Sequence, residues 1–233
     1  MAKKKSSATV INKVADLVSS VVLEESFDIE LMYRGQSDVD WELSPQIDRA
    51  QFLTYRERKG MTRREHEFKL LDQFRNSALP HVSLQPQNQW QELALAQHHG
   101  LATRLLDWSL SPLVALYFAV NQKTDSDSAV WCYKHDKKHF TNHLDPMSID
   151  RPIVYDPPHV TSRITAQSGK FIACPTGALL SDLEKAPTKL VIPNNKRLNI
   201  KKQLAALGIN EASLFPGIDG TARNTNWNYS DCH

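Results

Sequence analysis

Apolar residues recur at intervals of three and four in five segments of the chain, and this spacing predicts amphipathic helices. The predicted helices span residues 11–22, 62–80, 90–99, 111–120 and 196–207. Thr62 and Glu65 form a capping-box pattern at the start of the second helix. Ser111 and Pro112 give the fourth an N-cap and a proline at its first position.

Shorter apolar runs, bounded by turn-forming residues, predict strands. These lie at residues 30–34, 103–108, 129–133, 152–155, 170–174 and 188–192. We expect an α+β fold, with a mixed or antiparallel sheet and flanking helices in a single domain over residues 9–222. A disordered basic leader is expected at residues 1–8. Residues 223–233 lack periodicity and are expected to form a mobile tail.

Composition excludes several classes of protein. The chain has 233 residues, of which 41% are hydrophobic, and this excludes wholesale disorder. Its longest apolar run, residues 113–120, is far shorter than the roughly 20 residues of a membrane helix. No apolar segment follows the basic N-terminus, so no secretory signal is visible. Three scattered cysteines suit a reducing compartment, and CxxC and HExxH are absent. We expect a soluble cytoplasmic protein that has no membrane contact and no metal site.

The formal net charge of +2 hides a segregation of charge along the chain. Residues 21–50 carry eight acids against two arginines, whereas residues 51–75 carry seven bases against four acids. Residues 182–202 carry six bases against two acids. Basic patches of this kind can steer a polyanion, although such patches are more often solvent-exposed faces of helices.

The segment Tyr33-Arg34-Gly35-Gln36 ends the first predicted strand. An arginine followed by glycine presents a planar guanidinium beside backbone that a ligand can approach closely. This arrangement suits bidentate binding of phosphate or carboxylate. The alternative is an ordinary turn in which Arg34 pairs with one of the surrounding acids.

A second group of polar residues lies where the strand at 103–108 leads into the helix at 111–120. His98, Arg104, Asp107 and Ser109 fall among residues that are typical of a core, and buried polar groups need partners. One interpretation is a buried ion pair between Arg104 and Asp107. A Ser-His-Asp triad of Ser109, His98 and Asp107 is another, but no Gly-x-Ser-x-Gly elbow surrounds the serine.

These motifs resemble those of the FRG domain family, which is named for its Phe/Tyr-Arg-Gly signature. The matching segments are Tyr33-Arg34-Gly35-Gln36, His98-His99-Gly100, residues 103–108, Arg163 with Gln167 and Gly169-Lys170-Phe171, and Leu214-Phe215-Pro216. They occur in the family's order from about residue 30 to about residue 222. The resemblance implies an FRG domain over residues 9–222.

A weaker resemblance, to arginine-serine-glutamate ADP-ribosyltransferases, bears on chemistry. Those enzymes carry a first-strand Tyr-Arg-Gly, a Ser-Thr-Ser strand end before an Ala-x-x-Phe-Ala helix, and a catalytic Glu before Leu-Phe/Leu-Pro. Arg34, residues 115–119 and Glu211 follow this order. The resemblance implies an ADP-ribosyltransferase-like fold. Asp107-Trp108-Ser109 replaces Ser-Thr-Ser, and Glu211 lies one residue further from the proline than the catalytic Glu would.

The same resemblance implies NAD as a substrate and a set of site residues. Catalysis would use Arg34, Ser109 and a carboxylate, which is either Glu211 or Asp107. The residues implied to bind the dinucleotide are Tyr33, Arg34, Gly35, Gln36, His98, Thr103, Arg104, Trp108 and Gln167.

The implied reaction cleaves the bond between ribose and nicotinamide through an oxocarbenium-like transition state. It needs an anion clamp that holds the dinucleotide and a carboxylate that stabilises the developing positive charge. Tyr33, Trp108 or Phe118 would supply an aromatic wall for nicotinamide. No metal is required.

Our leading hypothesis is a cytoplasmic ADP-ribosyltransferase that acts as a toxin-like effector in bacterial toxin–antitoxin or anti-phage defence. It would modify a macromolecule, RNA in preference to protein, because two basic patches can attract a polyanion. These patches contain Arg56, Arg58, Lys59, Arg63, Arg64, Lys196, Arg197, Lys201 and Lys202. A neutralising antitoxin could dock on the apolar stripe of the first helix. The alternatives are a non-catalytic nucleotide- or phosphate-sensing module that uses Arg34, His98 and Arg104, and a hydrolase that uses Ser109 and His98.

Overall fold

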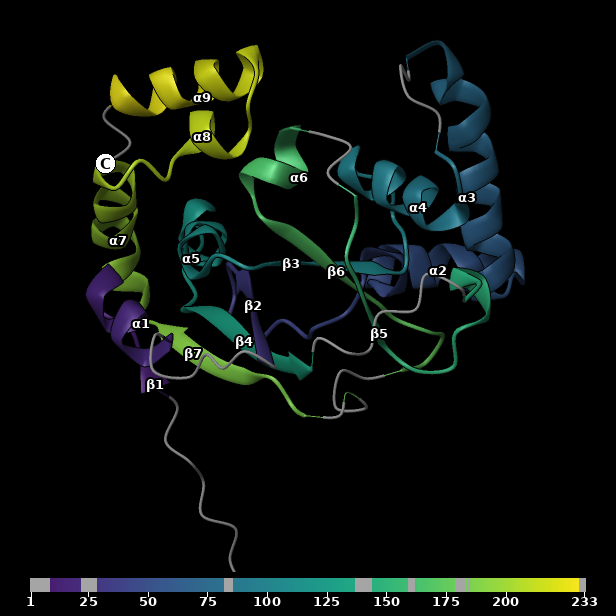
Figure 1. The fold of residues 1–233 in the computed structure, drawn as a ribbon, viewed down its shortest axis with the longest axis horizontal. Coiled ribbons are helices and arrows are strands. Elements are labelled where there is room, and N and C mark those ends of the chain that lie inside the picture. The colour runs from purple at the N-terminus through teal and green to yellow at the C-terminus, as the bar shows by residue number, and fades with distance from the viewer. Residues whose placement is uncertain are drawn as a thin grey trace, which may run out of the picture.

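A seven-stranded sheet forms the centre of the computed structural model (Figure 1), which describes residues 9–21, 29–81, 86–136, 144–158, 162–178, 183 and 185–230. The strands are β1 (Thr9–Val10), β2 (Ile29–Gln36), β3 (Leu105–Ser109), β4 (Ser128–Asp136), β5 (Ile153–Tyr155), β6 (Gly169–Ala173) and β7 (Thr188–Ile192). Their order is β1-β7-β4-β2-β3-β6-β5. β1 runs parallel to β7 and the other pairs are antiparallel. The predicted α+β class with a mixed sheet is confirmed.

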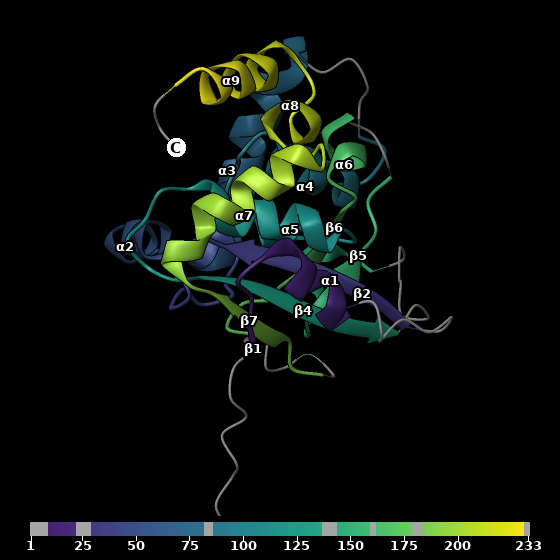
Figure 2. The same cartoon turned by 90° about the vertical axis from the view of Figure 1, so that its left-hand side faces the viewer.

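Helices gather over one face of this sheet (Figures 1 and 2). The described helices are α1 (Val14–Val21), α2 (Ala50–Lys59), α3 (Arg63–Ala78), α4 (Gln89–His98), α5 (Pro112–Asn121), α6 (Ser162–Ala166), α7 (Asn194–Ala206), α8 (Glu211–Leu214) and α9 (Ile218–Asn228). The capping box of Thr62 and Glu65 and the N-cap of Ser111 are present as predicted.

The helix-covered face of the sheet carries two apolar clusters. The first packs α1, α5 and α7 against β2, β4 and β7, and includes Tyr33 and Leu116. The second packs α3 and α4 against β3, β5 and β6, and includes Leu93 and Phe171. Side chains alternate between the faces of a strand, so the next residues point to the other side. There Met32, Trp108 and their neighbours form a third cluster.

Two helices differ from the sequence-based expectation. α2 was missed because its sequence carries no apolar stripe; its buried side chain is Arg56. Residues 223–228, expected to begin a tail, belong to α9, whose buried residue is Gly220. Periodicity could not reveal α9, because it is held by polar contacts. The expected leader and residues 231–233 lie outside the described residues.

Within the part of the chain that the structure describes, no helix has both the length and the apolarity needed to cross a bilayer.

Candidate functional site

The central strands β2 and β3 pair at one position, next to Arg34, and separate beyond it. β2 pairs with β4 along its whole length but with β3 only at Tyr33 and Ser109. Arg34 reaches across this gap: its Nη1 donates to the Asp107 carbonyl oxygen at 2.6 Å and lies 3.8 Å from Asp107 Oδ2. Only 12% of the Arg34 side chain is exposed. Burial lowers the pKa of Arg34, and the charge of Asp107 opposes this shift.

Asp107 is the exposed carboxylate of this region, with 60% of its side chain accessible. It accepts a hydrogen bond from Gln97 Nε2 at 2.9 Å. The Gln97 amide is itself fixed in orientation, because Thr103 Oγ1 donates to Gln97 Oε1 at 2.7 Å. Thr103 itself is fully buried, so it positions Gln97 and is not itself exposed to a ligand.

Arg163 and His98 complete a group that we call the Asp107 site: Arg34, Gln97, His98, Asp107 and Arg163. Arg163, on α6, donates from Nη1 to the His98 carbonyl oxygen at 3.4 Å. Burial lowers the pKa of Arg163, and Asp107 opposes the shift. Burial also lowers the pKa of His98 to about 4, assisted by the neighbouring His99 and Arg163. Near pH 7 the site therefore holds two cations, one carboxylate and a neutral imidazole.

The shifted pKa of His98 predicts a pH dependence of stability. An unfolded histidine titrates near pH 6.5, so between pH 4 and 6.5 the unfolded chain binds more protons than the folded one. Stability should therefore fall as the pH is lowered through this window. Urea unfolding of the wild type and of His98→Asn measures the effect, and the variant should lose part of the slope. An imidazole resonance of His98 that titrates at 6.5 or above would contradict the expectation.

Glu211 makes no contact with Arg34 among the described interactions, although its charge opposes the lowering of the Arg163 pKa by burial. Its carboxylate accepts hydrogen bonds from Tyr117 Oη at 2.8 Å, Asn121 Nδ2 at 3.0 Å and Arg223 Nε at 3.0 Å. Burial alone would raise the pKa of Glu211, but these three donors outweigh it and the pKa is lowered. The carboxylate thus ties α8 and α9 to α5.

Glu211, at the start of α8, contacts the side of α5 that faces away from Arg34, and this explains why the two do not meet. Ala115 and Ala119 of α5 lie against the Gly35 backbone. Tyr117, two residues further along, points to the opposite side of the helix, where it holds Glu211. Of the two carboxylates expected from the sequence, the structure therefore brings Asp107 beside Arg34.

Gly35 lies beneath α5. A Cβ atom added there would lie 1.9 Å from the Ala115 carbonyl oxygen and 2.5 Å from the Ala119 nitrogen. The expectation that Gly35 lets a ligand approach the backbone is thus wrong, because the backbone of α5 occupies that space.

The aromatic residues expected to line the site are packed inside the protein. Tyr33 and Trp108 are each 3% exposed and belong to the apolar clusters. Phe118 packs edge-on against Tyr117 and Phe215. Gln36 is also internal: its side chain accepts from Trp131 Nε1 and donates to the Glu42 carbonyl oxygen. None of these side chains offers a free wall for a nicotinamide ring in the arrangement described.

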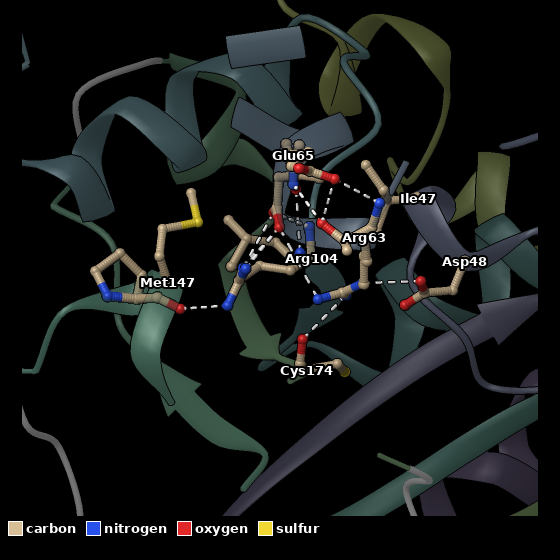
Figure 3. A network of polar contacts seen from close by, with 12 residues as sticks. Ile47, Asp48, Arg63, Glu65, Arg104, Met147 and Cys174 are labelled. Atoms are coloured by element: carbon tan, nitrogen blue, oxygen red, sulfur yellow. Dashed lines mark hydrogen bonds and ion pairs between the residues drawn. The ribbon is translucent and has the colours of Figure 1, made fainter. Parts of the chain in front are cut away.

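Arg104 belongs to a buried network of polar contacts (Figure 3). Its guanidinium binds Glu67, with Nη2 2.6 Å from Oε2, and donates to the Pro146 carbonyl oxygen. The interpretation that Arg104 pairs with Asp107 is wrong, because Glu67 of α3 holds it. Arg104 is 3% exposed and Glu67 is fully buried, so Arg104 is not available to a nucleotide in this arrangement.

The Ser109 hydroxyl is engaged by backbone groups. It donates to the Gln167 carbonyl oxygen at 2.6 Å and accepts from the Ser111 amide at 2.9 Å. Its proton is therefore not available to a histidine base, and the geometry gives the hydrolase interpretation no support. The Gln167 side-chain amide donates to the Leu214 carbonyl oxygen at 3.0 Å. This bond connects the segment before β6 to the end of α8.

Two surfaces expected to meet partners are partly internal. Arg56, Arg63 and Arg197 of the basic patches are each at most 7% exposed and bind protein oxygens. In the described part of the apolar stripe of the first helix, Val14 and Val21 are buried in the first cluster, whereas Val18 is 39% exposed. Docking of a neutralising partner on this helix stays a prediction.

Sequence reasoning missed Gln97 and Glu67. Gln97 adjoins the His98-His99-Gly100 motif, and its position near the end of a helix was the available signal. Glu67 gave none, because it lies within a helix of alternating charges. Among the described residues, no three His, Cys, Asp or Glu side chains gather as a metal site.

Comparison with known families finds one match. The family model described as FRG domain matches residues 29–128, which include β2, β3, α5 and four of the five residues of the Asp107 site. Comparisons with curated proteins and with solved structures give no match.

Proposed function

The chain carries an FRG domain over residues 29–128, and we propose that this domain binds a phosphate-bearing nucleotide at the Asp107 site. The observation that carries the proposal is the contact of the mostly buried Arg34 with the exposed carboxylate of Asp107; Arg163 lies close enough for the Asp107 charge to oppose the lowering of its pKa by burial. Arginine pairs bind phosphate oxygens through charge-assisted hydrogen bonds. With Asp107 as the one acid and His98 neutral near pH 7, the site has an excess of positive charge.

An unsatisfied donor also favours an incoming acceptor. Arg34 Nε is buried and has no hydrogen-bond partner within the described structure. Trp108 Nε1, on the adjacent strand, is likewise buried and unpartnered. Buried donors without partners are costly and are expected to find an acceptor. An oxygen of a bound phosphate, entering where β2 and β3 separate, would satisfy Arg34.

NAD is the nucleotide that we propose first. Its two phosphates suit a site that contains two arginines, and a carboxylate such as Asp107 can accept hydrogen bonds from ribose hydroxyls. The Gln97 amide, fixed by Thr103, holds Asp107 in place for that contact.

ADP-ribosyl transfer is a second candidate, favoured by the 3.8 Å separation between Arg34 Nη1 and Asp107 Oδ2. A carboxylate beside an anion clamp can stabilise the positive charge that develops on ribose as nicotinamide leaves. In this proposal Asp107 replaces Glu211 as the catalytic carboxylate. A transferase of this kind would act on RNA or protein as a toxin-like effector, with a neutralising partner.

Nucleotide binding is tested by calorimetry with NAD, ADP-ribose and ATP. Arg34→Gln and Arg163→Gln should each weaken binding about tenfold or more, because each removes a charged hydrogen bond. Arg58→Gln, which removes an exposed arginine on α2, is the matched control and should leave affinity unchanged. Equal affinity in all four proteins would contradict the proposed site.

Transfer is tested separately, by release of nicotinamide and by labelling of RNA or lysate protein from labelled NAD. Asp107→Asn should abolish both signals and retain NAD binding. Glu211→Gln should retain them wherever circular dichroism shows an intact fold. Binding without nicotinamide release would exclude the transferase and leave a nucleotide-sensing module.

A further inference from the structure

Positive charge is concentrated in the C-terminal part of the fold. Residues 185–230 hold seven lysines and arginines against two acids, in a chain whose net charge is +2. These residues form β7, α7, α8 and α9, and the three helices gather at one end of the molecule (Figures 1 and 2). Glu211 pairs with Arg223 and Arg197 is buried, so the other cations of this region are five lysines.

Three cations, one of them on the neighbouring α6, lie beside aromatic rings of this region. The guanidinium carbons of Arg163 and Arg223 lie 4.6 and 5.2 Å from the centre of the Phe215 ring. Lys201 Nζ lies 5.2 Å from the centre of the Trp227 ring. Half of the Arg223 side chain is accessible, at 51%. Basic groups held beside aromatic rings are typical of surfaces that bind single-stranded nucleic acid.

The outer side of α9 continues this chemistry. Its sequence is rich in asparagine and threonine and contains a single acid, Asp219. Tyr229, just beyond its last turn, is 89% exposed. An exposed ring can stack on a base, while amide and hydroxyl groups can contact phosphate and sugar.

We propose that α7, α8 and α9 form a binding surface for single-stranded nucleic acid. Lys201, Lys202 and Arg223 contact the phosphates, and Tyr229 stacks on a base. This surface, which we call the α7–α9 surface, borders the Asp107 site through Arg163, but it needs no bound nucleotide. A negative result for RNA binding at this surface would therefore say nothing against nucleotide binding at the Asp107 site, and the reverse also holds.

The test is fluorescence anisotropy with a labelled 20-nucleotide single-stranded RNA, without NAD, at 50 and 200 mM salt. The wild type should bind, and its affinity should fall steeply with salt, because phosphate contacts release counterions. Lys201→Gln with Lys202→Gln should weaken binding about tenfold and flatten the slope by about 1.4, at roughly 0.7 per phosphate contact. Tyr229→Ala should weaken binding about fivefold or more with the slope retained.

The matched control is Lys123→Gln with Arg151→Gln, which removes the same charge from exposed positions outside both basic patches. Its affinity should stay within about twofold of wild type, since general electrostatics between exposed charges are screened by salt. Equal losses in the two double variants would overturn the proposal, because they would indicate non-specific charge attraction. Absence of RNA binding, or binding of anionic lipid vesicles instead, would also overturn it.

Discussion

Replacing Glu67 with alanine is expected to lower the free energy of unfolding by about 3–5 kcal/mol. Glu67 is fully buried and accepts from the backbone amide, Nε and Nη2 of Arg104 at 2.6–3.1 Å. Arg63 Nη1 lies 3.9 Å from the same carboxylate. The substitution would leave the Arg104 guanidinium buried without its counter-charge, and that is the costly case for a buried ion pair.

Urea unfolding measures this loss. Glu92→Ala is the matched control, because Glu92 also binds an arginine through two bonds, to Arg75 at 2.8 and 2.9 Å. Arg75 is 52% exposed, so that loss should stay within about 1 kcal/mol. Equal losses in the two variants would show that burial does not govern the Glu67 pair.

A double-mutant cycle separates pairing from packing. Arg104→Met alone leaves the buried Glu67 with only the longer contact to Arg63, whereas the double variant with Glu67→Gln removes both charges of the pair. The double variant should therefore be more stable than the sum of the single losses predicts. Additive losses would mean that the two side chains stabilise the fold independently.

The contact between Glu67 and Arg104 changes what the motif at residues 103–108 means. Thr103, Arg104 and Trp108 are internal, and only Asp107 is exposed. Most of this signature thus stabilises the junction between α3, α4 and β3. Its chemistry is confined to one carboxylate and to Arg34 across the gap.

Local patterns predicted the elements better than the contacts between them. The strand at 188–192 and the capping box at Thr62 were predicted correctly, because each depends on neighbouring residues alone. The partner of Arg104 was not, since Glu67 lies 37 residues away and spacing does not rank distant acids.

The same limit applies to the two candidate carboxylates. The sequence left open whether Glu211 or Asp107 supplies the carboxylate. They differ in the fold, where α5 presents Tyr117 and Asn121 to Glu211 and the separation of β2 from β3 exposes Asp107 to Arg34.

Replacing Gly35 with alanine is expected to cost about 3 kcal/mol or more, the upper end of the range for overpacked positions. The added Cβ would lie 1.9 Å from the Ala115 carbonyl oxygen. The nearest atoms, the Ala115 carbonyl oxygen and the Ala119 nitrogen, belong to the backbone of α5, so no side-chain rotation can relieve the contact. Either α5 must move from β2 or β2 must bend, and Arg34, the preceding residue, would move with the strand.

Gly169→Ala is the control, since a Cβ there meets its nearest atom at 3.6 Å. Removing a glycine from a strand without a clash should leave stability unchanged or raise it by about 0.4–1 kcal/mol. Thermal unfolding compares the two variants, and calorimetry with NAD follows the site. Gly35→Ala should unfold at a much lower temperature and lose affinity at temperatures where it remains folded. If Gly35→Ala were as stable as Gly169→Ala, the close packing of α5 on β2 would be contradicted, and with it the geometry that directs Arg34 toward Asp107.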